Sequence, residues 1–165
     1  MTIVELMITS AILLVVLLAT LSSFESVSNA QAYQADRSKT IDAMRGVLNR
    51  LTKDLRQATS VVEPPVSTPS LITYTTSING VSTQIIYTAS GTTLTRKVGS
   101  AAAFTVLTGL ASTSVFGYQS ADSATGVQWV EMNLQVRPAR LPSTTLVLES
   151  EVNLRNRTSA LTASS

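Results

Sequence analysis

The chain has 165 residues, of which 44% are hydrophobic and only 13% are charged, about half the charged share of an average soluble protein. It contains no His and no Cys, which excludes a Ser-His-Asp triad, a thiolate nucleophile, a Cys/His zinc site and a disulfide framework. The formal charge of +2 is too small by itself to indicate a nucleic-acid partner. We therefore expect no enzyme, no cofactor and no metal site.

The first predicted element is an apolar helix over residues 1–24. Glu5 is its only charged residue, and the 19 residues from Leu6 to Phe24 contain no charge, Pro or Gly. At a rise of about 1.5 Å per residue they form a helix of roughly 28 Å, close to the ~30 Å hydrocarbon core of a bilayer. Because this segment is apolar on all sides, we expect it to be buried in lipid or in other protein.

Residues 25–60 are predicted to continue the helix in amphipathic form. Apolar residues spaced three or four apart form one stripe: Ile41, Met44, Leu48, Leu51, Leu55 and Ala58. No helix breaker separates the two halves, which predicts one helix of about 60 residues and roughly 90 Å. Pro64, Pro65 and Pro69 are expected to end it, because proline lacks the backbone donor that a helix needs.

Residues 61–157 are predicted to form an antiparallel β-sheet head, followed by a polar tail over 158–165. The chain contains 23 Thr and 22 Ser, and after residue 60 they alternate with Val, Ile and Leu, as is typical of strands. Asn79-Gly80 predicts a hairpin. The predicted strands are 71–76, 83–88, 92–98, 104–107, 112–119, 127–137 and 144–156.

The last two predicted strands each have one apolar and one polar face. Val130, Met132 and Leu134 alternate with polar residues in one strand, and Leu148 and Val152 do so in the next. A sheet with one wet face needs a cover for the other, and the helical stripe can supply it. The sequence therefore predicts an α+β fold in which a long N-terminal helix packs on a C-terminal antiparallel sheet.

Glu5 needs a partner if the first helix is surrounded by apolar groups. An isolated carboxylate there costs several kcal/mol, and such residues are functional by default. If many of these helices pack side by side, the α-amino group of Met1 in one chain can neutralise Glu5 in the next. No Lys or Arg precedes Arg37, so the positive-inside rule would keep the head cytoplasmic unless a basic leader had been removed before Met1. The alternatives are that Met1 is an initiator methionine and that Glu5 is an incidental interfacial carboxylate.

The first thirteen residues resemble a known protein class. Met1-Thr2-Ile3-Val4-Glu5-Leu6, followed by Met7-Ile8-Thr9-Ser10-Ala11-Ile12-Leu13, is similar to the start of mature type IV pilins and type II secretion pseudopilins. Leu94-Thr95-Arg96, Phe116-Gly117-Tyr118 and Leu154-Arg155-Asn156 give a weaker similarity to W-type minor pilins and J-type pseudopilins. The chain departs from many pilins in having Leu14, Ser22 and no cysteine pair.

The resemblance implies a processing and assembly route. Met1 would be exposed by prepilin peptidase and N-methylated, and Glu5 would pair with the amino terminus of the neighbouring subunit. The implied partners are further copies or other pilin subunits, together with the inner-membrane assembly machinery. The chain would cross the cell membrane once, with its head outside, and would then enter an extracellular pilus.

Three functions follow as hypotheses. The first is a structural subunit of a type IV pilus-like filament, and the second is a minor pilin or pseudopilin that primes or caps a short fibre in a type II secretion or competence machine. The third is a membrane-anchored binding domain that does not polymerise.

The best acidic pair, Glu149 and Glu151, is explained by a wet strand face better than by catalysis. Arg96-Lys97 and the pair Arg155 and Arg157 could contact DNA phosphates, but four scattered cations without an aromatic platform do not by themselves indicate a nucleic-acid partner.

Overall fold

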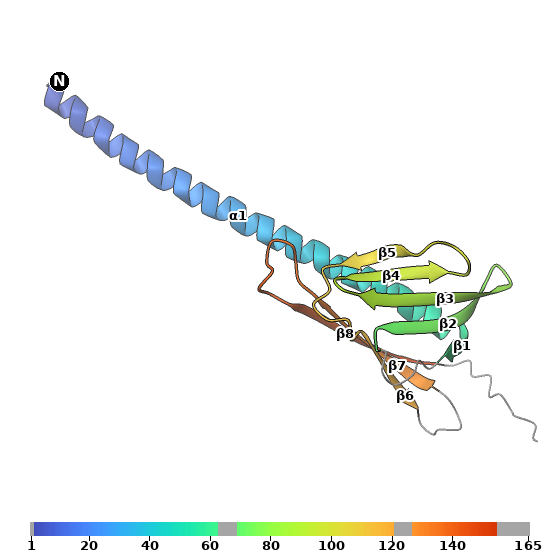
Figure 1. Cartoon of the computed structure of the whole chain (residues 1–165). Coiled ribbons are helices and arrows are strands. Elements are labelled where there is room, and N and C mark those ends of the chain that lie inside the picture. The colour runs from blue at the N-terminus through green and yellow to red at the C-terminus, as the bar shows by residue number, and fades with distance from the viewer. Residues whose placement is uncertain (1, 63–68, 121–126, 155–165) are drawn as a thin grey trace, which may run out of the picture. The chain divides into compact units, whose positions relative to one another are not determined.

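A computed structural model describes residues 2–62, 69–120 and 127–154 and divides into two compact units, Met1–Ser38 and Lys39–Ser165. One helix, α1 (Ile3–Arg56), contributes to both units and is followed by eight strands (Figure 1). The strands are β1 (Ala58–Val62), β2 (Leu71–Ile78), β3 (Val81–Ser90), β4 (Thr93–Val98), β5 (Phe104–Thr108), β6 (Phe116–Ser120), β7 (Val127–Val136) and β8 (Leu146–Asn153). The predicted α+β class, a long N-terminal helix followed by antiparallel strands, is confirmed.

In the second unit, one side of α1 is buried in the head. Its buried side chains are Met44, Val47, Leu48, Leu51 and Leu55, and Ile41 is half-buried. The spacing of three and four residues places these side chains on one face, where they join the apolar side chains of both sheets in a single core. Val47 was missing from the predicted stripe, although it lies three residues after Met44 and so shares its face.

The helix ends at Arg56 rather than near residue 60, and the expected role of the prolines in ending it is wrong. Ala58 is buried, but in β1, where it pairs with Thr76 of β2. The β-branched residues of β1 favour a strand over a further helical turn. The Thr76 hydroxyl donates a hydrogen bond to the backbone oxygen of Gln57 at 3.3 Å, which pairs a carbonyl that the ending helix leaves free.

The first sheet contains β1 to β5 in sequence order, and each strand is antiparallel to the next. The predicted hairpin at Asn79-Gly80 is confirmed, because Ile78 pairs with Val81 across it. Asn79 and Gly80 have φ angles of 52° and 81°, the left-handed conformations that a two-residue turn of this kind requires.

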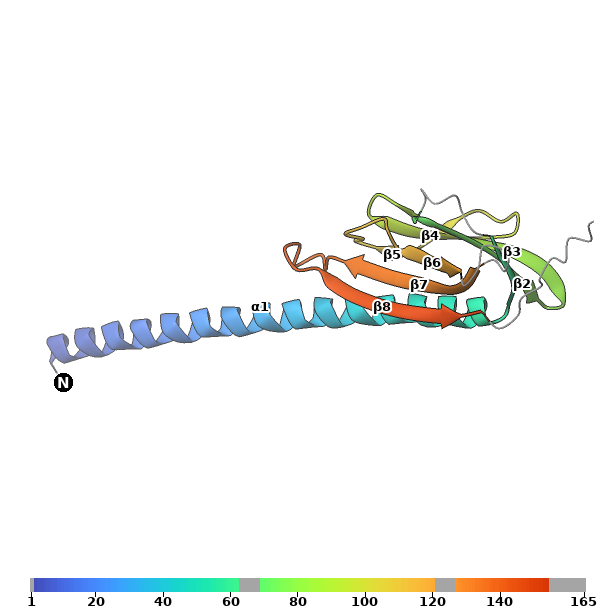
Figure 2. The ribbon, with the colours of Figure 1, turned by 90° about the horizontal axis from the view of Figure 1, so that it is seen from below.

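The second sheet contains β6, β7 and β8, so the head has two sheets where the sequence indicated one. An isolated bridge between Leu110 and Val136 links the segment after β5 to β7. The Tyr118 hydroxyl also donates to the Leu71 carbonyl at 2.5 Å. In Figure 2, β7 and β8 lie beside the C-terminal part of α1. The predicted strand 112–119 begins only at Phe116, and the tail 158–165 lies outside the described residues.

Candidate functional site

The candidate site in the first unit is the apolar surface of α1. Every described residue from Thr2 to Gln31 is exposed. Ile3 is 81% exposed, Leu13 69% and Phe24 73%. The helix contains an apolar stretch that is long enough to cross a membrane and of which nothing is buried, and no other helix in the described part of the chain has this length and composition. Its length and composition are compatible with a membrane anchor.

Four hydroxyl groups within this apolar segment already have partners in the helix. Thr9 donates to the carbonyl oxygens of Glu5 and Leu6, both at 3.0 Å. Further bonds to preceding carbonyls are made by Ser10 (2.9 Å), Thr20 (2.8 Å) and Ser23 (2.9 Å). Because these hydroxyls need no water, they can enter lipid or a protein core at a lower free-energy cost than unpaired ones.

Glu5 has a local role that the sequence analysis missed. The Glu5 backbone N–H donates to Thr2 Oγ1, and the Thr2 backbone N–H donates to Glu5 Oε2, each at 3.4 Å. This reciprocal pair is a capping box, which pairs two of the free donors of the first helical turn. The Thr-x-x-Glu spacing was the available signal. Met1, the proposed partner of Glu5 in a neighbouring chain, lies outside the described residues.

A second cluster joins the helix to the first sheet in the head. Asp54 accepts hydrogen bonds from the Tyr74 hydroxyl at 3.1 Å and from Arg96 Nη2 at 3.2 Å. The Arg96 guanidinium carbon lies 5.7 Å from the ring centroid of Tyr87, which stacks with Tyr74. Burial raises the pKa of Tyr74 well above its ordinary value, and neighbouring Tyr87 and Asp54 add to this effect. The phenol therefore stays protonated as a hydrogen-bond donor.

This geometry bears on the residues considered for DNA contact. Arg96 is only 5% exposed and is committed to Asp54, so it offers no surface contact to a phosphate. Lys97 is exposed, whereas Arg155 and Arg157 lie outside the described residues. The burial of Arg96 was not visible from the sequence, because its partner lies 42 positions earlier in the chain.

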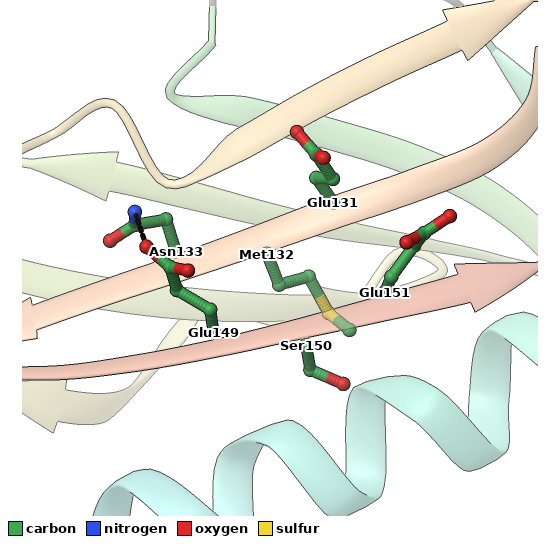
Figure 3. Close-up of a pocket in the computed structure, with 6 residues that line it drawn as sticks. All are labelled: Glu131, Met132, Asn133, Glu149, Ser150 and Glu151. Atoms are coloured by element: carbon green, nitrogen blue, oxygen red, sulfur yellow. Dashed lines mark hydrogen bonds between the residues drawn. The ribbon is translucent and has the colours of Figure 1, made fainter.

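A group of acidic side chains occupies the outward face of β7 and β8. Figure 3 shows Glu131, Asn133, Glu149 and Glu151 on one side of these strands, with Met132 and Ser150 turned toward the other. Glu149 accepts a hydrogen bond from Asn133 Nδ2 at 2.7 Å. Glu149 and Glu151 thus share the predicted wet face, and Glu131 joins them there.

The structure does not gather these carboxylates into a metal centre. Within residues 2–62, 69–120 and 127–154, no group of three or more His, Cys, Asp or Glu side chains is placed to hold a metal ion. The Glu131 carboxylate lies over Gly117 of β6, where a Cβ atom would come within 3.2 Å of Glu131 Oε2. The three carboxylates therefore form a charged surface rather than a converging ligand set.

Comparison with protein-family models, with curated proteins and with solved structures returns no match to this chain.

Proposed function

We propose that the chain is a structural subunit of a type IV pilus-like filament, held in the membrane by the apolar part of α1 until it is assembled. The observation that carries this proposal is the apolar helix, exposed on all sides in the first unit, with one carboxylate near its start. A packed β head follows it in the second unit. The first residues of the chain add the resemblance to pilins.

The energetics of such an assembly explain why one carboxylate matters. Moving an apolar helix from lipid into a helical bundle exchanges one apolar environment for another, so hydrophobic burial adds little driving force. Packing contacts and the few polar groups must then supply the specificity. We propose that Glu5 meets the amino terminus of the neighbouring subunit, so that two charges neutralise each other and set the register between helices.

Substitution of Glu5 tests the proposal. Glu5→Val should leave the chain in the membrane fraction but abolish filaments seen by electron microscopy. The matched control is Glu25→Val, which removes the next exposed carboxylate along the helix and should leave filaments intact. Normal filaments from Glu5→Val would contradict the proposal.

A third variant separates the charge of Glu5 from its capping role. Glu5→Gln keeps a side chain that can complete the capping box with Thr2 but removes the negative charge. If the charge pair drives assembly, Glu5→Gln should be as defective as Glu5→Val. Wild-type assembly by Glu5→Gln would assign Glu5 to helix capping alone.

Two further observations distinguish the related hypotheses. Labelling of the chain along whole filaments supports a repeating subunit, whereas labelling only at a tip supports a minor pilin or pseudopilin. Mass spectrometry of the N-terminal peptide should show a methylated Met1, and an unprocessed upstream leader would argue for an anchored domain that does not polymerise.

A further inference from the structure

The outer side of α1 in the second unit is strongly basic. Five cations on this segment are exposed: Lys39, Arg45, Arg50, Lys53 and Arg56. One exposed acid, Asp42, lies among them, whereas Asp54 is turned to Arg96. Lys53 lies two positions from both Leu51 and Leu55, which places it on the side of the helix opposite the buried stripe. We call the five cations the basic helix face.

The outer side of the second sheet has the opposite charge. Its exposed carboxylates, Glu131, Glu149 and Glu151, form what we call the acidic sheet face. The outward side chains of β7 and β8 include no cation. Figure 3 shows Glu131 and Glu151 directed away from the neighbouring helix.

The acidic sheet face contains an arrangement that folding of the head does not favour. Glu131 and Glu151 are direct cross-strand partners in the ladder between β7 and β8. Like charges directly opposite each other destabilise a sheet. The Gln119 amide reaches Glu131 Oε1 at 3.4 Å but carries no charge with which to offset this repulsion. A cationic group from outside the head would offset it.

We propose that the basic helix face of one copy of this chain contacts the acidic sheet face of another copy. Both faces turn away from the core that their elements share, so they cannot meet within one head. A contact between two different faces of identical chains repeats from copy to copy, as a filament requires. This inference rests on the proposed filament function. Exposed ion pairs set orientation more than affinity, which suits heads whose attached helices already pack against one another.

Charge reversal in the full-length chain tests this contact. Lys53→Glu and Glu149→Lys should each lower the yield of sedimented filaments about fivefold at low salt, since each replaces attraction by repulsion. The two changes combined in one chain should restore most of the yield. The differences between variants should disappear near ~1 M NaCl, where the screening length falls to about 3 Å.

Two matched controls account for net charge. Lys97→Glu reverses an exposed cation of β4 and changes the net charge by the same amount as Lys53→Glu. Glu25→Lys reverses an exposed carboxylate of the first unit and changes the net charge by the same amount as Glu149→Lys. Both controls should assemble like the wild type. An equal loss of yield in controls and test variants would overturn the inference.

Cross-linking gives an independent readout because the native chain has no cysteine. Filaments of the Lys53→Cys, Glu149→Cys double variant, treated with a short bismaleimide, should give a ladder of covalent multimers. The Lys97→Cys, Glu149→Cys variant should give none. Equal ladders from both pairs, or no ladder from the first, would contradict a contact between the two faces.

The outcomes keep this inference separate from the proposed function. If the wild type forms filaments that depend on Glu5, but Lys53→Glu and Glu149→Lys both leave the yield unchanged, only the head contact is overturned. If Lys53→Glu weakens binding to DNA or to anionic vesicles without affecting filaments, the basic helix face serves a polyanion and the inference is wrong. If the wild type forms no filaments, the proposed function fails, and cross-linking of the full chain in detergent then decides the head contact.

Discussion

At the scale of single residues, Asp54 adds a polar link between the helix and the first sheet. It lies on the half of α1 that packs in the head, and its carboxylate receives both the Tyr74 hydroxyl and the Arg96 guanidinium. Arg96 is buried and Asp54 is 19% exposed, so the pair is only partly screened by water. Removing Asp54 would leave the buried Arg96 charge without compensation, and removing Arg96 would leave the partly buried Asp54 carboxylate without its cation; both changes are costly.

A double-mutant cycle should measure this coupling. We expect Asp54→Ala to lower the free energy of unfolding by about 3 kcal/mol, because it leaves Arg96 and the Tyr74 hydroxyl unpaired. Arg96→Ala should cost a similar amount. The double variant should cost less than the sum by about 2 kcal/mol. Denaturant unfolding of the full chain in mild detergent gives the values, and strict additivity would show that the two side chains do not interact.

At the scale of elements, the turn after β5 connects the two sheets. Gly109 has a φ of 81°, a left-handed conformation that residues with a side chain rarely adopt. Its carbonyl oxygen accepts a hydrogen bond from the Arg137 backbone N–H at 2.8 Å. Leu110 then bridges to Val136 at the end of β7. The close backbone approach at Gly109 lets the chain pass from one sheet to the other.

Two alanine substitutions separate the cost of the left-handed conformation at Gly109 from the cost of its close approach to the Arg137 backbone. A Cβ atom at Gly109 would lie 2.8 Å from the Arg137 backbone oxygen, whereas one at Gly91, where φ is 56°, meets nothing within 4 Å. Gly91→Ala should therefore cost only the left-handed conformation, about 1 kcal/mol. Gly109→Ala should cost about 2 kcal/mol more, because backbone must also shift. Equal losses of unfolding free energy would show that the close approach does not matter.

At the scale of the whole molecule, the two units place their apolar residues in opposite environments. The first unit exposes its apolar side chains, whereas the second buries them between helix and sheets. The head therefore has its own core, and the first unit needs an external apolar partner. A membrane would satisfy that need, and so would neighbouring helices in the filament proposed above.

Membrane insertion should fail when charge is placed in the middle of the apolar segment. Leu13→Arg with Val16→Arg adds two cations, each of which disfavours insertion by about 2.5–3.5 kcal/mol at the centre of a helix. We expect the variant to be released by alkaline carbonate, while the wild type stays with the membrane. The control variant carries Asn29→Arg and Gln34→Arg beyond the apolar segment and should also stay. Retention of the Leu13, Val16 variant would contradict a membrane span.

Elements with strong periodicity were predictable from sequence. The alternation in β7, the Asn79-Gly80 hairpin and the helical stripe from Met44 to Leu55 all depend on neighbouring residues. The end of α1 was placed wrongly because β1 is stabilised by pairing with β2, and that pairing is not encoded in the local pattern. The candidate site was predicted only in part, because Glu5 stood out by its isolation, whereas its bonds with Thr2 were overlooked although they are local and the Thr-x-x-Glu spacing indicates them.

The sequence by itself determined that this protein has an apolar N-terminal helix with one carboxylate, an amphipathic continuation and a β-rich head, because composition and periodicity are local properties. Only the tertiary structure decided that the strands form two sheets and that Arg96 is buried against Asp54. It also placed Glu131 directly opposite Glu151. These features join residues far apart in the chain, and their free energies depend on burial and register, which exist only once the chain has folded.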